Sequence, residues 1–397
     1  MFGKTKALGI ILIFFLSSFI PITSSYSSYE TNKAYSIHID ENGTLSGYVK
    51  DISMNPMEGV VIRAYCDENY YENVSDSSGY YYIDNISFIS NRHSVCAFKT
   101  GYKTIWVKVR ITENTKYDFV LTSIETIYVD DDNTAGPWNG TQEHPYQYIQ
   151  DGINHAGNGD TVHIYSGTYF ENVIVDKSII LVGENRNNTI IDGQNKGNAI
   201  YVEVYSVSIE NFTIKNGNNG VAFYPSAHTL SYNFIISHNI IINNYYGVDS
   251  ETTEHVNITG NIIVENNYGI VFCDVQNSVI RYNHILLNKK IGILCTWVAY
   301  RGSYSNSIYY NTIQKNTMGI FLESSPRNKI ICNNFYQNIV DASFQSSNLN
   351  DWNHNYWNRP RILPKPVIGT MYFNIPWVNF DWHPAKEPYD IPIPEVA

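Results

Sequence analysis

The sequence contains few charged residues. Only 16% of its 397 residues are Asp, Glu, Lys or Arg, and the formal net charge is -11. Such a chain lacks the basic stripe that neutralises a phosphate backbone, so nucleic acid is not expected as a partner. The short motifs of P-loop, Rossmann and serine-hydrolase proteins are also absent from the sequence, which argues against those three classes of enzyme.

Long apolar runs are scarce as well. One run, at residues 7–20, follows Lys4 and Lys6 and is followed by Pro21 and small residues. This order is typical of a signal peptide, which we place at residues 1–25. The alternative is an uncleaved anchor, but the run is shorter than the roughly 20 residues that span a bilayer. We expect an exported protein, extracellular or on the cell surface, without another transmembrane segment.

The five cysteines give no metal-binding pattern. Cys66 and Cys96 lie in strand-like runs near the N-terminus, and outside the cell they could form a disulfide or remain reduced. Cys273, Cys295 and Cys332 occur one per repeat, and we expect them to be small core residues because their spacing matches no zinc site.

Asparagine, isoleucine and glycine recur at a regular interval. A first Asn occurs at 211, 239, 261, 283, 311 and 333, and a second follows five residues later each time. A glycine before an apolar residue recurs at 220, 247, 269, 292 and 319. Ile-rich runs between turn residues favour strands over helices. The period predicts a parallel β-helix with coils of about 22 residues, with stacked Asn ladders and with glycines at positive-φ corners. Right-handed winding follows from the preference of parallel crossovers.

The region before the repeats differs in pattern. Short alternating strands separated by turns fill residues 44–123 and predict a small β-sandwich. The strings Gly47-Tyr48-Val49, Gly59 to Ala64, Gly79 to Ile83 and Gly101-Tyr102 resemble the carboxypeptidase regulatory-like (prealbumin-like) domain. That resemblance implies an accessory module without catalysis. The fold class is therefore predicted as all-β, a β-sandwich followed by a right-handed parallel β-helix.

The β-helix is predicted over residues 127–350. Ile149, Ile153 and Ala156 have the spacing of one helix face and predict a short helix across its open N-terminal end. The following strings Gly159-Asp160-Thr161, Gly167-Thr168-Tyr169 and 181–184 resemble the opening of pectin-lyase-like proteins. Residues 351–397, which hold four of the seven Trp and eight of the fourteen Pro, are predicted to cap the C-terminal end.

The repeats themselves resemble those named for NosD. The resemblance lies in the Asn-Ile-Ile and Asn-Asn-Tyr-Gly-Ile strings, and in Asn355-Tyr356-Trp357 and 379–382. It implies a β-helix surface protein, and its name implies copper. The eleven His do not form a column, however, and His238 and His284 lie on different sides of the repeat Asn. No metal or other cofactor is predicted, and calcium has no supporting motif.

Two coils contain six extra residues, and they mark the candidate site. The insertions occupy the same place in the coil, at residues 223–232 and 296–304, and three coil steps should separate them by about 14 Å. Aromatic rings and carboxylates together suit a sugar-binding groove. The candidate ligand-binding residues are Tyr224, Tyr232, Asp249, Asp274, Trp297, Arg301 and Tyr304.

Three readings of this groove remain open: inert loops, saccharide binding and catalysis. A polysaccharide lyase would need a base such as Arg281 or Arg301, with Asp249 and Asp274 as an acidic cluster. A glycoside hydrolase would need two carboxylates. No spacing identifies a catalytic set. We therefore favour non-catalytic binding of polysaccharide or cell-surface glycan, or a structural or adhesive role, with a carbohydrate-active enzyme as the alternative.

Overall fold

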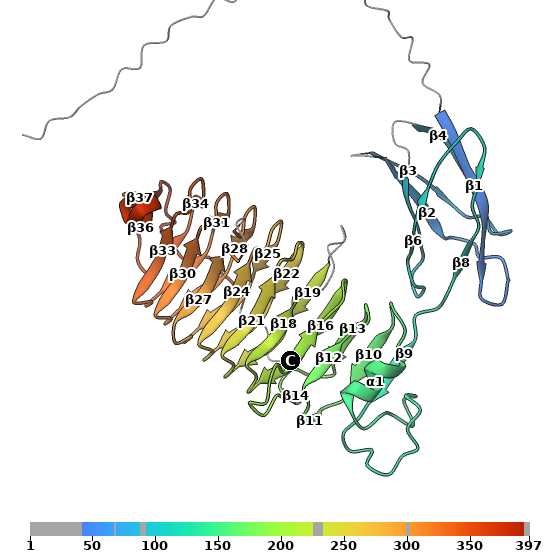
Figure 1. Cartoon of the computed structure of the whole chain (residues 1–397), viewed down its shortest axis with the longest axis horizontal. Coiled ribbons are helices and arrows are strands. Elements are labelled where there is room, and N and C mark those ends of the chain that lie inside the picture. The colour runs from blue at the N-terminus through green and yellow to red at the C-terminus, as the bar shows by residue number, and fades with distance from the viewer. Residues whose placement is uncertain (1–41, 67–68, 88–92, 225–232, 299–301, 393–397) are drawn as a thin grey trace, which may run out of the picture. The chain divides into compact units, whose positions relative to one another are not determined.

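The computed structural model describes residues 42–66, 69–87, 93–224, 233–298 and 302–392. Within these residues the chain is almost entirely β, with one short α-helix, which confirms the predicted fold class. Figure 1 shows the N-terminal strands and the stack of coils. The predicted signal peptide lies outside the described residues.

The N-terminal strands form a β-sandwich. One sheet contains β4 (Tyr80–Ser87), β1 (Asn42–Asp51), β7 (Thr115–Lys116) and β8 (Phe119–Leu121), and the other contains β3 (Asn69–Val74), β2 (Val61–Cys66), β5 (His93–Phe98) and β6 (Ile105–Val109). Alternate residues of each long strand face the interior, where Leu45, Ile62, Val95 and Phe119 are buried. The alternation in the sequence therefore encodes this core.

Of the two alternatives left open for Cys66 and Cys96, the structure shows the one without a disulfide. Cys96 is paired with Arg63 across the antiparallel β2 and β5. Cys66 lies three residues beyond Arg63 on the same strand, so its side chain points to the opposite face from that of Cys96. A bond between the two thiols would require the sheet to break its register.

The coils of the β-helix contribute strands to three parallel sheets. Sheet I contains β9 (Thr126–Val129), β10 (Thr161–Ile164), β13 (Ile180–Gly183), β16 (Val207–Glu210), β19 (Phe234–Ser237), β22 (Val256–Thr259), β25 (Val279–Arg281), β28 (Ser307–Tyr309), β31 (Lys329–Ile331) and β34 (Asp351–Asn353). Sheet II contains β11 (Gly167–Tyr169), β14 (Thr189–Asp192), β17 (Thr213–Lys215), β20 (Ile240–Ile242), β23 (Ile262–Val264), β26 (His284–Leu286), β29 (Thr312–Gln314), β32 (Asn334–Tyr336) and β35 (Tyr356–Trp357). Sheet III contains β12 (Val173–Val175), β15 (Ile200–Val202), β18 (Asn219–Phe223), β21 (Tyr246–Glu251), β24 (Tyr268–Cys273), β27 (Ile291–Thr296), β30 (Met318–Glu323), β33 (Val340–Gln345), β36 (Lys365–Met371) and β37 (Ile375–Asp381).

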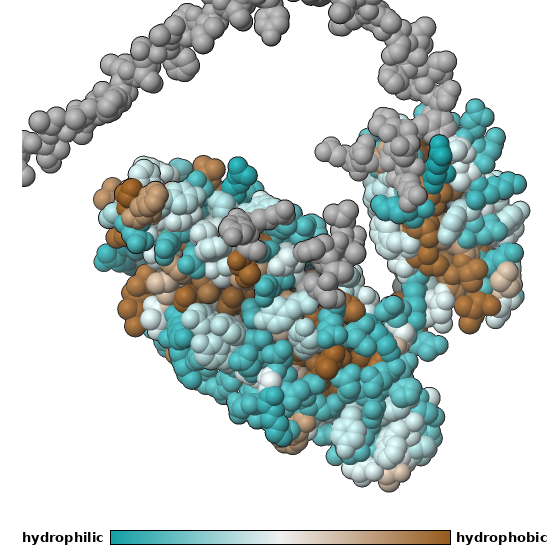
Figure 2. Space-filling view, viewed as in Figure 1, coloured by the Kyte–Doolittle hydropathy of each residue, from teal (hydrophilic) through white to brown (hydrophobic). Residues whose placement is uncertain are grey.

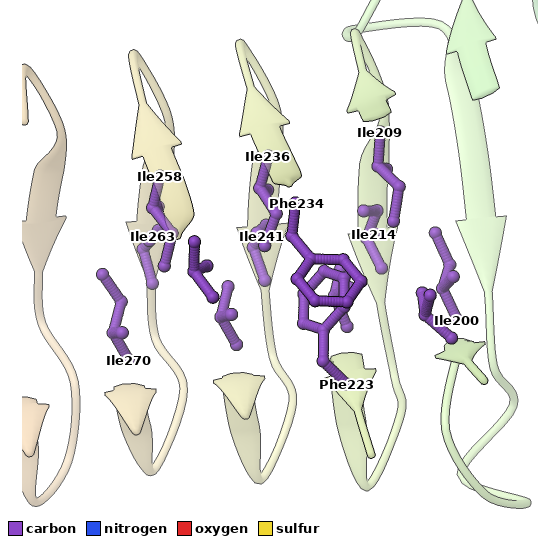
Figure 3. Packing of buried hydrophobic residues seen from close by; sticks show 14 of the residues in the cluster. Ile200, Ile209, Ile214, Phe223, Phe234, Ile236, Ile241, Ile258, Ile263 and Ile270 are labelled. Atoms are coloured by element: carbon purple, nitrogen blue, oxygen red, sulfur yellow. The ribbon is translucent and has the colours of Figure 1, made fainter. Parts of the chain in front are cut away.

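Identical positions of successive coils stack in the interior. Ile209, Ile236 and Ile258 are register partners in sheet I, as Ile214, Ile241 and Ile263 are in sheet II. Figure 3 shows these side chains in files that point into the helix. Phe223 and Phe234 lie between them with ring centroids 4.6 Å apart. Each coil thus covers the apolar face of the one before it.

The predicted helix over the N-terminal end is present as α1 (Ile149–His155). Ile149 and Ile153 are fully buried against the first strands. The carboxylate of Glu171 accepts hydrogen bonds from the backbone N–H groups of Ile149 (2.8 Å) and Gln150 (3.0 Å). Glu171 therefore satisfies two of the donors that the start of a helix leaves unpaired.

The asparagine ladders are present, with one correction. The amide oxygen of each ladder Asn accepts the backbone N–H of the Asn one coil earlier, at 2.9–3.0 Å from Asn239 through Asn355. A second ladder runs from Asn244 to Asn338. Asn211 and Asn216, predicted as first rungs, are one residue out of register. Phe212 and Gly217 donate to Asn239 and Asn244 instead.

The repeat glycines have a different role from the one predicted. None of them has a positive φ; that conformation is adopted by residues such as Glu265, Tyr282 and Leu287, just before each ladder Asn. A Cβ at Gly247 or Gly269 would lie 2.4 Å from the glycine carbonyl oxygen of the next coil. These positions require glycine because neighbouring coils approach too closely for a side chain.

The C-terminal end extends the stack beyond residue 350. β34 and β35 add a further coil, and the hairpin β36–β37 completes sheet III. Trp352 and Trp357 close the core and are buried, whereas Trp377 and Trp382 are exposed. Only half of the predicted aromatic cap therefore covers the last coil.

Candidate functional site

Both insertions leave the coil at the turn from sheet III to sheet I, which we call the III–I corner. The first follows β18 and the second follows β27, with β21 and β24 between them. Tyr232 and Arg301 lie outside the described residues. The described candidates are Tyr224, Asp249, Asp274, Trp297 and Tyr304. The outer face of sheet III between the insertions is therefore the surface on which predicted residues can meet.

Tyr224 and Asp249 are brought together. The hydroxyl of Tyr224 donates a hydrogen bond to Oδ2 of Asp249 on the next strand. Burial is the main cause that raises the pKa of Asp249; the Tyr224 hydrogen bond opposes it and Glu251 adds to it. Burial and the neighbouring Asp249 carboxylate also raise the pKa of Tyr224. The pair is a half-buried hydrogen-bonding unit at the surface.

Asn219 extends this polar group. Its Nδ2 donates to Oδ1 of Asn198 at 3.0 Å and lies 3.4 Å from the Tyr224 hydroxyl. Its Oδ1 is buried and has no hydrogen-bond partner within the described residues. A buried acceptor without a donor is costly. Such an atom beside an exposed cluster is a place where a ligand hydroxyl or a water could donate.

One file of outward side chains runs along the ends of the sheet III strands. We call it the acid file; it consists of Tyr224, Glu251, Cys273, Thr296 and Glu323. The Thr296 hydroxyl donates to Oε2 of Glu323 at 2.6 Å. Burial, followed by the charges of Glu251, Asp274, Asp249 and Glu323, raises the pKa of Cys273 to about 12. The file is therefore acidic and its thiol stays protonated.

Asp274 lies at the III–I corner and supports the second insertion. Its Oδ1 accepts the backbone N–H of Gly302 at 2.9 Å. Asp274 and Gly302 both have left-handed backbone conformations, with φ of 54° and 68°. A Cβ on Gly302 would lie 1.8 Å from the carbonyl oxygen of Ser324. The two residues fix the end of the insertion.

Trp297 and Tyr304 lie away from the Tyr224–Asp249 pair. Trp297 begins the second insertion, and Tyr304 forms a bridge with Gln276 on the sheet I side of the corner. Arg281, a candidate lyase base, lies in β25 of sheet I, where its guanidinium is 3.4 Å from the Tyr309 hydroxyl. Outward side chains of sheets I and III diverge, so Arg281 does not meet Asp249.

Sequence reasoning missed Glu323 and Cys273 as site residues. Glu323 was not considered because it lies one coil beyond the predicted groove. Cys273 follows the buried Phe272 and was expected to be a core residue. Of the three cysteines expected in the core, only Cys295 is fully buried. Alternation along each strand was the available signal, because Glu251, Cys273 and Glu323 share one register position. Figure 2 shows hydrophobic patches within a mainly hydrophilic visible face of the β-helix.

Solved structures similar to this chain are distant. XylC in its complex with xylose shares 11% identity over 65% of this chain and 73% of its own, with a TM-score of 0.45. The A-module of mannuronan C-5 epimerase AlgE6 of Azotobacter vinelandii shares 12% (58% and 78% covered, TM-score 0.41). Pectin methylesterase PemA of Erwinia chrysanthemi shares 12% (64% and 85% covered, TM-score 0.33). No function is inferred from such low scores. No curated protein matches the chain significantly.

A family profile matches much more directly. The family described as periplasmic copper-binding protein (NosD) matches residues 152–374. Copper is held by clustered His, Cys and Met side chains. Across the described ranges, no three His, Cys, Asp or Glu side chains gather closely enough to hold a metal. His354 and His383 stack with ring centroids 5.7 Å apart, but they are only two. Among the described residues, no group of three His, Cys, Asp or Glu therefore offers a copper site.

The described residues also include no helix long and apolar enough to cross a bilayer. The profile covers most of the β-helix, from α1 to the turn between β36 and β37, and more than half of the chain. The coil period, the Asn ladders and this match agree. The chain belongs to the NosD family.

Proposed function

We propose that this chain is an exported, extracellular or cell-surface protein that binds neutral polysaccharide without cleaving it. The binding surface is the outer face of sheet III between the two insertions. The observation that carries the proposal is the Tyr224–Asp249 pair, with the Asn219 acceptor beside it. Carboxylates and amides accept hydroxyl protons, and the Tyr ring offers an apolar face.

The charge of this surface favours a neutral ligand. Glu251 and Glu323 lie in the acid file, and Asp249 lies two residues before Glu251 on the same face of β21. Four carboxylates act together on Cys273. A uronate or sulfated chain would be repelled by these charges, because like charges across an interface cost affinity. Neutral hydroxyl-rich chains avoid that cost.

Binding fits the described geometry better than catalysis. A lyase needs a base beside the acidic residues; of the two candidates, Arg281 lies on another sheet and Arg301 lies outside the described residues. One oxygen of Asp274 is already bonded to the Gly302 backbone. The predicted signal peptide and the resemblance of residues 44–123 to accessory carboxypeptidase regulatory-like domains support an exported binding protein.

A glycoside hydrolase is the second candidate. Asp249 and Glu251 are two residues apart on one face of β21, which separates their backbones by about 7 Å. That spacing is compatible with the carboxylate separation of inverting enzymes. The raised pKa of Asp249 would suit a general acid.

The test is retention of the purified protein on insoluble cellulose, chitin and mannan, with assay of released reducing ends. We expect retention on at least one polymer without product. Asp249→Asn and Tyr224→Phe should weaken retention, and Asp151→Asn, an exposed residue of α1, should not. Product formation lost in Asp249→Asn would establish the hydrolase, and unchanged retention in both site variants would refute the proposed surface.

A further inference from the structure

A pocket lies at the III–I corner, on the C-terminal side of the second insertion. Its volume is about 280 Å³. It is lined by Trp297, Gly302, Ser324, Pro326, Ser346, Asn348 and Tyr372. It shares no residue with the acid file or with the Tyr224–Asp249 pair. These seven lining residues all belong to the part of the chain that the structure describes.

Two exposed aromatic rings belong to this pocket. The Trp297 side chain is 43% exposed, and that of Tyr372 is 60% exposed. Trp297 follows β27, and Tyr372 begins the turn (Tyr372–Asn374) that joins β36 to β37. The strands β27, β30, β33 and β36 are successive neighbours in sheet III, so the strand ends that carry the two residues are three coil steps of about 4.8 Å apart, and both side chains reach the pocket between them. Two segments distant in sequence therefore contribute one ring each.

The floor between the rings is built from small corner residues. Gly302, Ser324 and Ser346 occupy the same corner position in successive coils, with φ of 68°, 46° and 50°. The backbone N–H groups of Ser324 and Ser346 are each bonded at 2.8 Å to the next coil, at Gln345 and Thr370. Their hydroxyls and the exposed Asn348 amide remain as short polar groups that both donate and accept.

No charged side chain is among the described lining residues. A pocket that pairs aromatic faces with hydroxyl and amide groups matches a pyranose ring, whose faces are apolar and whose edge carries hydroxyls. A charged ligand would find no counter-charge on these described residues. We propose that the Trp297–Tyr372 pocket is a separate saccharide-binding site that takes a neutral hexose unit.

The test is titration of the full chain with maltose, cellobiose and mannobiose, followed by saturation-transfer NMR and calorimetry. We expect at least one disaccharide to bind wild type. Trp297→Ala and Tyr372→Ala should each raise its Kd about tenfold or more, because each removes a ring that the bound sugar would cover. Tyr372→Phe keeps the ring and should retain binding. Tyr148→Ala removes an equally exposed Tyr elsewhere and should change nothing.

Asp249→Asn, measured in parallel, separates this pocket from the proposed polysaccharide surface. Unchanged disaccharide affinity in Asp249→Asn, with loss in Trp297→Ala, supports the pocket even where polymer retention fails. Disaccharide binding that survives both alanine substitutions overturns the pocket, and so does a wild type that binds none of the three sugars. Neither of those results would decide whether Asp249 contributes to polymer retention.

Discussion

Asp381 occupies the place of the next rung above Asn355. Its Oδ2 accepts the backbone N–H of Asn355 at 2.9 Å and lies 3.3 Å from the Asn355 amide nitrogen. The indole N–H of Trp357 donates to the same oxygen at 2.9 Å. A fully buried carboxylate thus terminates the first Asn ladder and satisfies donors that the last coil would leave unpaired.

Asp381→Ala should destabilise the C-terminal coils. Three buried donors would lose their acceptor, so we expect the free energy of unfolding to fall by about 3 kcal/mol or more. Urea denaturation followed by circular dichroism measures the change. Asp351→Ala, which removes an exposed carboxylate from β34, is the control. Equal stability of the two variants would contradict the terminating role of Asp381.

Asn283→Ala should be among the most damaging single changes in the coils. The Asn283 amide donates to the carbonyls of Ile258 and Arg281, and its oxygen accepts from Asn261. Removing it leaves several buried groups unpaired, at a cost of about 2–4 kcal/mol. Asn267→Ala, at a half-exposed position outside both ladders, should cost far less. Thermal melting of both variants would decide, and comparable losses would refute the importance of the ladder.

Gly269→Ala should destabilise the β-helix although φ at this position is not positive. The added methyl group would meet the carbonyl oxygen of Gly292 at 2.4 Å. The coils would have to separate locally, which we expect to cost about 1–3 kcal/mol. The measurement is the urea midpoint of the variant against wild type. A neutral result would mean that neighbouring coils can spread without loss of packing.

Asp249 should make the stability depend on pH. Burial raises its pKa in the folded state, so the folded protein binds this proton more tightly than the unfolded chain does. Ionisation therefore opposes folding, and the stability associated with Asp249 declines as pH rises through its ordinary value of about 4 and on through the higher folded value. Asp249→Asn removes this titration. Relative to wild type, the variant should gain stability as pH rises from about 3 to about 7, and parallel curves in urea denaturation would contradict the expectation.

Cys273 should react slowly despite its partial exposure. With a pKa raised to about 12, only a small fraction is thiolate at mildly alkaline pH. Alkylation by iodoacetamide should be on the order of a thousandfold slower than for an ordinary thiol. Glu251→Gln removes the carboxylate that has the largest effect among the neighbouring charges, and it should speed the alkylation of Cys273. Peptide mass spectrometry can follow Cys273, with the fully buried Cys295 as internal control. An unchanged rate in Glu251→Gln would show that the Glu251 charge does not contribute to the raised pKa.

The sequence was sufficient for the coil period because the same residue types recur at the same place in each coil. It also predicted α1, since Ile149 and Ile153 have helical spacing before the first strands. Asn211 was predicted as the first rung, but the residue that bonds to Asn239 is its neighbour Phe212. Spacing alone does not distinguish the two positions. Asp381 escaped notice because it follows Asn355 by 26 residues, whereas the two preceding rungs are 22 apart.

The candidate site was predictable only in part. The insertions do share one corner of the coil, as their spacing predicted, and Tyr224 and Asp249 are in contact there. The contribution of Glu323 and the pairing of Trp297 with Tyr372 depend on which strands are neighbours across several coils. Local spacing contains no such information. The Cys66–Cys96 disulfide was left open for a related reason, because antiparallel register decides which side chains of β2 and β5 share a face.

Loops at the III–I corner can vary in length with little effect on the packing of the coils. On one side of the second insertion Cys295 stacks in register with Phe272 and Leu322, and on the other Ser303 resumes hydrogen bonding to Ser325 and Val275. Five of the six extra residues of this coil therefore enter at the corner without shifting any rung. The segment between Thr296 and Gly302 can therefore be replaced by another sequence while the core stays unchanged. Related proteins with the same coils can in this way present different surfaces at this corner.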